Sequence, residues 1–545
     1  MIRSACPNTT ALGAPWRAPL SSGITVDAMD AQTQNNISQW SSRWAQRRPS
    51  ALAVVDEDRE LSWADFESRV AATAGAFRQM GIQKGDRIAF LLQNRTACLE
   101  ILLGAARLGA LTLPMNTRLS APELAYQLTD CRPRLLVHET ALETIVQEAL
   151  THSDHRPANR LRAGGEPDEF ESHLATAAPE LQCTPVTPDA PAILMYTSGT
   201  TGKPKGALLP HRKVLYNCLN AGLDFSIRGS DRVLVVAPLF HSLGLQILSL
   251  PVLYAGGTLF LQASFEEQRV WDTIQREQIT YFGGVPAMHQ RLYDALQSAP
   301  PHHWKTDSLR FIFTAGSAIA SHLVEAFHQR DLILRQGYGQ TETSTLCCLS
   351  PSDTLRKAGS VGRPVFHGEV RVITPNTRSL PPEDWDDVEV NQPGEVVVRG
   401  PITMLGYWEN PEATAETLID GWLCTGDLAQ WDSEGFLTLV GRSREMYISG
   451  GENVYPAEVE ATYREHPQIR EIAIVGEPDP RWGEVGRAHV LLEPGPPLSL
   501  AALQSWARSR LAPFKIPQSL VIEESLPRTA SGKVQKHLLR RSGPH

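Results

Sequence analysis

The chain has 545 residues, of which 42% are hydrophobic and 20% are charged, and its formal net charge is -9. That length exceeds what one hydrophobic core usually supports, so we expect an ordinary globular protein of two or more domains. The negative net charge argues against the broad positive field with which proteins attract nucleic acids or anionic membranes. Any anionic ligand must therefore be bound by a local site.

The N-terminal region and the cysteines indicate the compartment. Residues 1–29 are rich in Ser, Pro, Thr and Ala without an apolar signal-peptide core, and no later segment holds 18 unbroken apolar residues. The eight cysteines form no CxxC pair and no zinc-ligand spacing, which is typical of a reducing compartment. We expect a flexible extension over 1–29 on a cytoplasmic protein that has no integral membrane segment.

From Val54 onward, short apolar runs alternate with helical patterns, which predicts βαβ units around mainly parallel sheets. Residues 61–81 repeat apolar side chains at helical spacing, with a loose capping box at Ser62 and Asp65 and a stop at Gly81. Strands are predicted at 86–92 and 134–138, with an apolar helix at 99–110 between them. Residues 151–190 show little periodicity, so we expect a surface connection or a loosely structured subdomain edge there rather than core.

The alternation then resumes with predicted strands at 192–196, 231–238, 256–261, 279–286, 309–316 and 333–339. Beyond Val361, strands punctuated by glycine predict a small β-rich unit, and after Arg442 a compact tail of strand and helix patterns follows. The expected fold is α/β, with two doubly wound α/β subdomains and a small β-barrel-like subdomain over 30–441. A hinge at 442–445 and a small mobile α+β domain over 446–545 complete it.

A glycine-rich loop, YTSGTTGKPKG at Tyr196–Gly206, follows the strand predicted at 192–196. Because glycine lacks a Cβ, such a loop can bring its backbone N–H groups against an anion. Hydroxyl and ammonium groups are added by Thr197, Ser198, Thr200, Thr201, Lys203 and Lys205. The pattern predicts a phosphate-binding loop, with a solvated turn as the alternative. It is not the common GxxxxGK[ST] loop, because Pro204 stands where a magnesium-binding hydroxyl is needed.

Four further motifs follow this loop in order: GYGQTETS at 337–344, GWLCTGDLA at 421–429, GRSREMYISGGENVYPAEVE at 441–460, and PRTASGK at 527–533. Read alone, Glu342 is a turn residue, Asp427 a turn cap, and Lys533 a mobile surface charge. With all five motifs in order, the chain resembles the adenylate-forming enzymes over residues 30–540. That family includes acyl-CoA synthetases, luciferases and peptide-synthetase adenylation domains.

The resemblance implies a role for residues in each motif. ATP and CoA would be bound by Thr197, Ser198, Gly199, Thr200, Thr201, Gly202, Lys203, Gly316, Tyr338, Gly339, Thr341, Asp427, Arg442, Gly450 and Gly451. Within this set, Tyr338 would pack on adenine, Thr341 would contact the α-phosphate, and Asp427 would bind the ribose. Glu342 would hold Mg²⁺, and Lys533 would reach the reacting carboxylate and phosphate oxygens, a role that neighbouring Lys536 does not match.

The resemblance also implies an acyl pocket lined by Phe240, His241, Gly284, Ala315, Gly316 and Gly339. A core histidine is the plain alternative for His241, which we expect to line the pocket rather than to transfer protons. Rotation of the small domain would occur at Arg444, where the family commonly has Asp or Lys, and Glu445 follows in place of the usual Asp. The loop at 449–452 would then approach the thiol of CoA.

The motifs predict an AMP-forming acyl-CoA synthetase that uses ATP, Mg²⁺, CoA and a fatty, aryl or alicyclic carboxylic acid. An amino acid is disfavoured because the segment 237–245 carries no Asp for an α-ammonium group. Transfer to a separate acyl carrier protein is an alternative acceptor, and luciferase-type oxidation is a rarer activity. A P-loop-like phosphotransferase and a silent nucleotide-binding protein are the alternatives of another class. A homodimer is possible, and no nucleic-acid partner is expected.

Overall fold

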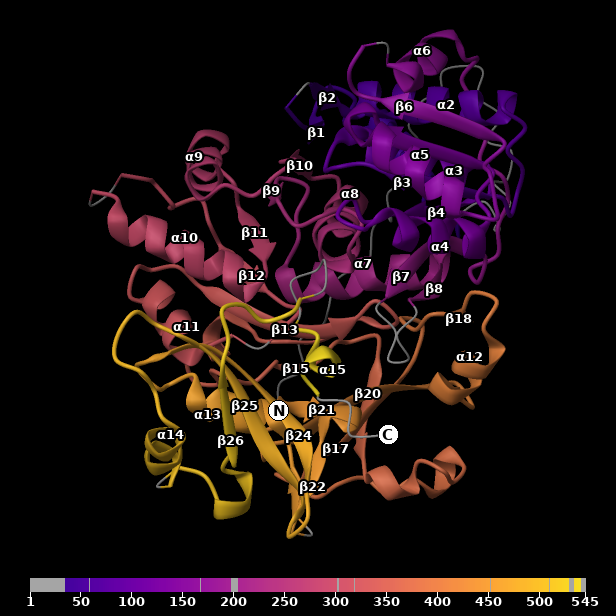
Figure 1. Ribbon diagram of the computed structural model, residues 1–545. Helices are drawn as coiled ribbons and strands as arrows, with labels where there is room; N and C mark the ends of the chain where they lie inside the picture. Colours follow the sequence, from indigo (N-terminus) through magenta and orange to yellow (C-terminus); the bar gives the residue numbers. More distant parts are fainter. Residues whose placement is uncertain are drawn as a thin grey trace, which may run out of the picture.

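The computed structural model describes residues 35–540, with gaps at residues 58, 167, 198–203, 301–302, 318, 451, 509 and 529–533. Two large mixed sheets with helices around them occupy the upper part of Figure 1, and a small antiparallel sheet and the C-terminal domain lie below. This α/β architecture confirms the predicted fold class. Among the described helices, none is both long and apolar enough to cross a membrane.

The first large sheet has the strand order β18-β8-β7-β4-β3-β5-β6. Its parallel strands are β3 (Arg87–Leu91), β4 (Leu111–Pro114), β5 (Leu135–Glu139), β6 (Asn159–Ala163) and β7 (Pro191–Thr197). Antiparallel β8 (Lys205–Pro210) and β18 (Gly406–Tyr407) extend it. The helices of this lobe are α2 (Trp63–Gln79), α3 (Thr96–Arg107), α4 (Ala121–Cys131), α5 (Glu143–His152) and α6 (Glu169–Thr176).

The second large sheet has the order β15-β14-β13-β12-β11-β9-β10-β1-β2. Its parallel strands are β1 (Leu52–Val55), β9 (Arg232–Val235), β10 (Thr258–Leu261), β11 (Tyr281–Gly284), β12 (Phe311–Thr314) and β13 (Leu334–Gln340). The antiparallel strands are β2 (Glu60–Ser62), β14 (Ser344–Cys348) and β15 (Arg363–Pro364). The helices are α1 (Gln39–Arg47), α7 (His211–Phe225), the π-helical segment η3 (Leu243–Ser249), α8 (Leu250–Ala255), α9 (Glu267–Glu277), α10 (Pro286–Ser298) and α11 (Ser321–His328).

The β-rich unit predicted beyond Val361 is an antiparallel sheet. It contains β16 (Glu369–Ile373), β17 (Gly394–Arg399), β19 (Leu418–Ile419), β20 (Trp422–Trp431) and β21 (Leu437–Arg442), together with α12 (Pro411–Thr417). Strand β20 is the long central member, and it pairs with β17, β19 and β21.

The C-terminal domain has a sheet and a hydrophobic core of its own. The strands are β22 (Tyr447–Ser449), β23 (Glu452–Val454), β24 (Ile469–Asp479), β25 (Gly483–Leu492) and β26 (Ser519–Ile522), and the helices are α13 (Pro456–Tyr463), α14 (Leu500–Ala507) and α15 (Lys536–Leu539). Val459, Tyr463 and Ile474 belong to a core cluster that contains only residues after Arg442. A domain that moves as a unit needs a hydrophobic core of its own.

Local sequence explains the start of α2 well. The hydroxyl of Ser62 accepts the N–H of Asp65 at 3.1 Å, and the carboxylate of Asp65 accepts the N–H of Ser62 at 3.3 Å. This reciprocal capping box is the predicted one. The helix then packs closely on α3, because a Cβ added at Gly104 would lie 2.8 Å from the Thr73 Cγ2 atom.

The prediction for residues 151–190 was wrong in part. This segment contributes the edge strand β6, paired in parallel with β5, and the helix α6. Leu161, Phe170 and Leu174 from these elements are buried in the core of the first lobe. An edge strand followed by a two-turn helix is too short to produce a clear hydrophobic period, which is why the sequence pattern missed both.

Candidate active site

Several of the predicted site residues lie at or next to the ends of strands in the two large sheets. Strands β11, β12 and β13 run parallel, so their carboxyl ends meet at the same edge of the second sheet. The motif 337–344 spans the end of β13 and the turn into β14. In open α/β sheets, ligands bind beyond these carboxyl ends. The strand ends therefore define the candidate active site.

One group of residues forms a polar cluster around the carboxylate of Asp427. The hydroxyl of Tyr338 donates to Asp427 Oδ2 at 2.7 Å, and the amide of Gln340 donates to the same oxygen at 2.6 Å. Arg442 Nε lies 2.9 Å from Asp427 Oδ1. Burial raises the pKa of Tyr338, and the Asp427 charge raises it further, so the phenol stays protonated as a donor. The structure thus joins Tyr338, Asp427 and Arg442, which the sequence places in three separate motifs.

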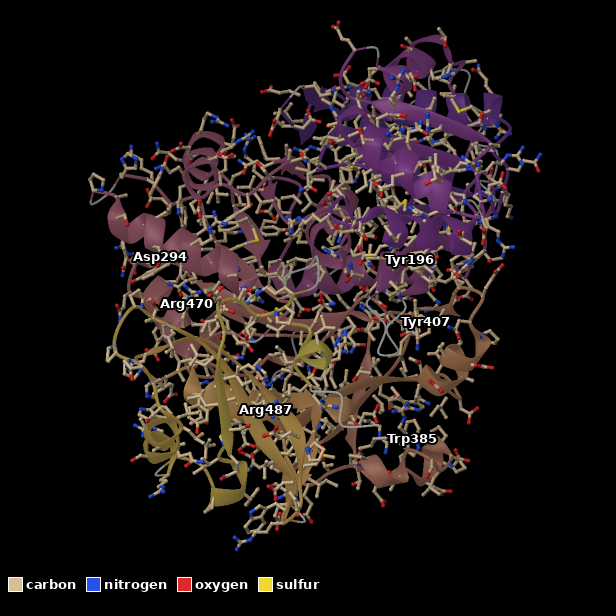
Figure 2. The ribbon with its side chains drawn as sticks, in the orientation of Figure 1. Tyr196, Asp294, Trp385, Tyr407, Arg470 and Arg487 are labelled. Atoms are coloured by element: carbon tan, nitrogen blue, oxygen red, sulfur yellow. The ribbon has the colours of Figure 1, made fainter. Side chains whose placement is uncertain are left out.

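A second group surrounds the carboxylate of Glu342. This residue is buried, and its Oε1 atom accepts hydrogen bonds from Thr197 Oγ1 at 3.2 Å and from the hydroxyl of Tyr407 at 3.0 Å. Thr197 is the last residue of β7, at the start of the glycine-rich loop. Figure 2 shows Tyr407 below Tyr196, the residue before Thr197. The start of the predicted phosphate loop, at Thr197, and the candidate metal ligand therefore lie together.

The residues around Glu342 fit a magnesium ion. Mg²⁺ prefers oxygen ligands and is usually bound through one or two carboxylates, with the remaining positions filled by phosphate oxygens and water. Glu342 supplies a buried carboxylate whose orientation is fixed by two hydroxyl groups, and it adjoins the loop predicted to bind phosphate. Glu342 would hold the ion, which supplies positive charge against the phosphates of ATP.

The residues expected to line the acyl pocket lie on two walls. The first wall is Phe240 and His241, immediately before η3; Phe240 is buried, and its ring centroid lies 4.6 Å from that of half-buried His241. The second wall is formed by the strand ends, where Ala315 donates its backbone N–H to Gly284 O at 3.3 Å. π-Helical segments are rare in proteins, and those that occur are often found at functional sites. The π geometry of η3 is therefore consistent with a functional position.

Glycines allow the two walls to approach. A Cβ added at Gly283 would lie 3.0 Å from Leu248 Cδ2, so η3 packs directly on β11. At Gly339 a Cβ would lie 1.9 Å from the carbonyl oxygen of Ser344, and this position accepts no side chain. Gly316 has a φ of 93°, in the left-handed region that glycine adopts without strain.

Lys213 on α7 links η3 to the start of β14. Its ammonium donates to Gln246 Oε1 at 3.0 Å and to Ser344 Oγ at 2.5 Å. Gln246 belongs to η3, and Ser344 begins β14 against Gly339. The Lys213 side chain is fully buried with these two neutral partners. Burial lowers the pKa of Lys213 to about 7, although the charge of Glu342 opposes this shift.

The substitution Lys213→Met is expected to stabilise the large domain at neutral and lower pH, because methionine fills a similar volume without burying a charge. The folded-state pKa of Lys213, about 7, lies below its ordinary value of 10.5, so the unfolded chain binds more protons between these pH values. The free energy of unfolding of the parent should therefore rise with pH across this window, and that of the variant should not. Urea-unfolding midpoints from about pH 6 to about pH 10 test this. A constant difference between the two proteins would contradict it.

Residues from the C-terminal part lie in different places. Arg442 ends β21 at the Asp427 cluster, and the backbone of Arg444 lies in the turn η7 (Ser443–Glu445). Gly450 lies in the connection of the β22–β23 hairpin, where its N–H donates to Trp482 O at 2.8 Å. Figure 1 draws β22 at the end of the small domain remote from β13, so the β22–β23 hairpin is not near the polar cluster. The predicted residues 198–203, Gly451 and Lys533 lie outside the described residues.

The sequence reasoning missed three residues that the structure brings into the site. Gln340 stands inside the motif 337–344, and its amide could have been considered as a donor. Tyr407 precedes Trp408 in a segment outside every motif, and Lys213 has no local signal at all, because its partners are 33 and 131 residues away. Thr341 is half-buried between Gln340 and Glu342.

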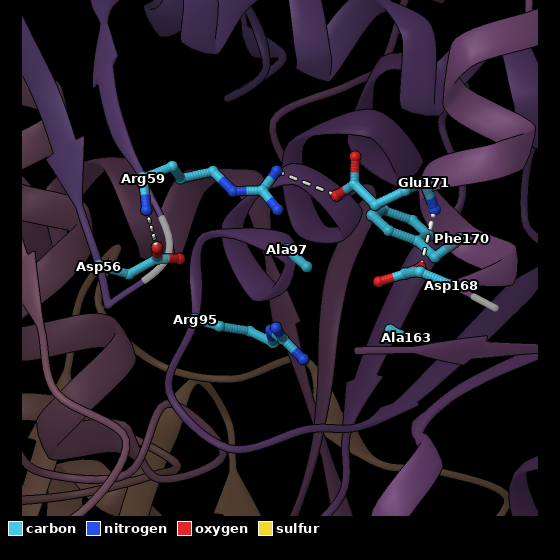
Figure 3. A pocket seen from close by; sticks show the side chains of 8 residues that line it. All are labelled: Asp56, Arg59, Arg95, Ala97, Ala163, Asp168, Phe170 and Glu171. Carbon is cyan, nitrogen blue, oxygen red and sulfur yellow. Dashed lines mark hydrogen bonds and ion pairs between the residues drawn. The ribbon is translucent and has the colours of Figure 1, made fainter. Parts of the chain in front are cut away.

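A separate pocket in the first lobe does not belong to this site. It is lined by Asp56, Arg59, Arg95, Ala97, Ala163, Asp168, Phe170 and Glu171 (Figure 3). Arg59 pairs with Glu171 at 3.0 Å, and Asp56 accepts hydrogen bonds from Arg59 N at 3.0 Å and from Thr96 N at 2.8 Å. These polar groups join α6 and the β1–β2 connection to α3, which is a structural role.

Two family models match the chain. The model described as AMP-binding enzyme matches residues 41–408, and the model described as AMP-binding enzyme C-terminal domain matches residues 458–533. The chain therefore belongs to the AMP-binding enzyme family. The first match contains the phosphate loop, the acyl-pocket walls and the Glu342 motif, and the second ends at Lys533.

Relatives of this AMP-binding enzyme match it over nearly their whole length. A feruloyl-CoA synthase of Amycolatopsis is 38% identical over 93% of this chain and 98% of that relative. An indoleacetate–CoA ligase of Aromatoleum aromaticum is 37% identical over 92% of this chain and 97% of that relative. The solved o-succinylbenzoate CoA synthetase of Bacillus subtilis, bound to its acyl-adenylate intermediate, is 31% identical with a TM-score of 0.81, over 93% and 98% of the two chains.

This AMP-binding enzyme is an acyl-CoA synthetase, an acid–thiol ligase that uses ATP, Mg²⁺ and CoA. ATP activates a non-amino carboxylic acid as an acyl-adenylate, with release of pyrophosphate. The acyl group then passes to the sulfur of CoA, with release of AMP. The predicted activity and substrates are confirmed at this level.

Proposed function

We propose that the acid activated by this acyl-CoA synthetase is aromatic, a ring that carries its carboxyl group directly or on a short side chain. The relatives named above are all named for aromatic acids of this kind. The structural observation that supports the proposal is the pair of rings at Phe240 and His241, 4.6 Å apart and inclined at 63°. Gly284 and Ala315, the small residues expected in the same pocket, lie at the ends of β11 and β12. A flat ring bound there could make edge-to-face contacts with Phe240 and His241.

An AMP-release assay over matched acids tests this proposal. The panel would contain ferulate, indoleacetate and o-succinylbenzoate beside straight-chain acids of six to eighteen carbons, each with ATP, Mg²⁺ and CoA. We expect at least one aromatic acid to give the highest kcat/KM. A straight-chain acid that exceeds every aromatic acid would overturn the proposal. An additional reaction with a phosphopantetheinyl carrier protein in place of CoA tests the alternative acceptor.

The positions of the described residues support a division of roles. Tyr338, Asp427 and Arg442 bind the nucleoside, and Thr341 and Glu342 lie at the phosphate end together with Thr197, the described residue at the start of the phosphate loop. Lys533 approaches the reacting oxygens during adenylation. Fixed dipoles and charges at the place where charge develops lower the barrier, so the protein needs no covalent intermediate of its own.

Rotation of the small domain about Arg444 would then exchange Lys533 for the loop that contains Gly450 and Gly451. This proposal is supported by the separate hydrophobic core of the small domain and by the remote position of the β22–β23 hairpin. One site could then serve adenylation and thioester formation in turn, since the two half-reactions need different groups at the same carbonyl.

The substitution Arg444→Pro is expected to spare adenylation and to depress thioester formation. Proline holds φ near -65° and removes one backbone degree of freedom, so rotation at this position is blocked. Acid-dependent pyrophosphate exchange measures the first half-reaction, and the conversion of supplied acyl-adenylate to acyl-CoA measures the second. Unchanged overall turnover would count against a hinge at Arg444. Arg444→Ala keeps the backbone free, so it serves as the control and should turn over normally.

A further inference from the structure

Lys536, the first residue of α15, is held between two carboxylates of the small domain. Its ammonium lies 2.9 Å from Glu445 Oε2 and 2.7 Å from Glu460 Oε1. The Lys536 side chain is 14% exposed and that of Glu460 is 6% exposed, so water screens these charges little. Burial lowers the pKa of Lys536, but the carboxylates of Glu460 and Glu445 outweigh burial and raise it, so the ammonium stays charged.

The two carboxylates belong to parts of the domain with distinct roles. Glu445 directly follows Arg444 in the turn η7, where the family usually has the shorter Asp. Glu460 lies on α13, and its Oε1 atom also accepts the backbone N–H of Ile474 in β24 at 2.8 Å. Lys536 therefore connects the residue after the hinge to the central helix and sheet of the small domain.

Lys536 also lies at the end of the segment that contains Lys533. Arg528 and Val534 form an antiparallel bridge, and Gln535 donates its backbone N–H to Pro527 O at 2.8 Å. These contacts bring together the two residues that flank 529–533. Lys536 is the next residue after Gln535, and its ion pairs attach these flanking residues to Glu445 and Glu460.

We propose that Lys536 is a positioning residue for adenylation, which fixes the chain next to Lys533 to Glu445, the residue that directly follows Arg444 in the hinge. The inference rests on the roles proposed above for Lys533 and Arg444. Glu445, Glu460 and Lys536 all follow Arg444 in the chain, so they turn as one body when the small domain rotates. The angle at the hinge would then set the position of Val534, the residue that follows Lys533 in the chain. Misplacement of a reacting group by about 1 Å can reduce a rate by about 100-fold, so such rigidity matters for catalysis.

The test compares the two half-reactions in Lys536→Met, using the full-length protein and the acid with the highest AMP release in the panel above. Pyrophosphate exchange should fall about 10-fold to 100-fold through kcat, because Lys533 is less well placed while the ATP-binding residues are untouched. Conversion of supplied acyl-adenylate to acyl-CoA should stay near the parental rate, since that step does not use Lys533. A role in folding alone would lower both half-reactions together.

Three further variants test whether the loss of exchange is due to the ion pairs of Lys536. Lys536→Arg keeps a cation within reach of both carboxylates and should retain exchange. Glu445→Asp shortens one carboxylate by a methylene and should lower exchange alone, with a smaller effect than Lys536→Met. Lys515→Met is the matched control, because it breaks another lysine–glutamate pair on α13, at 2.6 Å from Glu458, without touching the Lys533 segment. It should leave both half-reactions near the parental rates.

The outcomes separate this inference from the proposed function. If Lys533→Ala loses exchange but Lys536→Met and Glu445→Asp keep it, the positioning role is overturned and the role of Lys533 stands. If Lys533→Ala itself keeps exchange, the proposed function fails at that residue. Should Lys536→Met fold poorly, as judged by circular dichroism, Glu445→Asp decides the question, because it leaves a carboxylate and a cation in place.

Discussion

Lys533→Ala is expected to abolish acid-dependent pyrophosphate exchange while leaving the transfer of a supplied acyl-adenylate to CoA largely intact. A fixed cation beside the reacting carboxylate and α-phosphate stabilises charge that develops in the transition state. The loss of one such group typically costs about 100-fold to 1,000-fold in rate. Exchange of labelled pyrophosphate into ATP measures adenylation, and formation of the thioester measures the second step.

The two measurements must diverge for the divided roles to hold. Equal loss of both steps would refute the divided roles. It would mean that Lys533 takes part in both half-reactions or is needed for the small domain to fold. Lys515→Ala, a lysine of the same domain with an ion pair to Glu458, serves as the control and should leave both steps unchanged. Detection of ADP instead of AMP in the parent would contradict the synthetase reaction itself.

Glu342→Gln is expected to lower adenylation by about 100-fold and to raise the Mg²⁺ concentration needed for half-maximal rate. The amide keeps the size of the side chain and its oxygen can still accept from Thr197 and Tyr407, so only the charge at the phosphates is lost. Calorimetric titration of the protein with ATP at several Mg²⁺ concentrations gives a readout that is independent of turnover.

Tyr407→Phe provides the control for Glu342→Gln. It removes the hydroxyl that donates to Glu342 Oε1 at 3.0 Å and leaves the carboxylate in place. A modest loss is expected, since Thr197 still orients Glu342. If Glu342→Gln changes neither the rate nor the Mg²⁺ dependence, then Glu342 has a structural role and the metal is held by other groups.

Structural features that depend only on a short stretch of sequence could be predicted from the sequence. The capping box of α2 involves residues three positions apart, and its hydrogen bonds form in the structure as predicted. The strands of the parallel sheets are continuous apolar runs, which sequence patterns detect well. The motif 337–344 was placed correctly at the end of a strand, because a buried run ends there in glycines and polar residues.

Contacts between segments that are distant in the sequence could not be predicted in this way. The hydrogen bond between Tyr338 and Asp427 joins residues 89 positions apart, and each had a plain alternative role when considered alone. Family resemblance, not spacing, predicted that they share a site. The elements β6 and α6 were missed because their burial depends on packing against β5 and α2, and their own composition does not reveal it.

The sequence by itself determined the α/β class, the order of the nucleotide-binding motifs, and the family with its two half-reactions. These features depend on local periodicity and on short motifs whose residues act together. Only the tertiary structure decided that Tyr407 donates to Glu342, that Lys213 bonds both η3 and β14, and that Lys536 pairs with Glu445 and Glu460. Such contacts arise when the chain folds segments from distant positions against each other, and burial then selects the polar partners that satisfy one another.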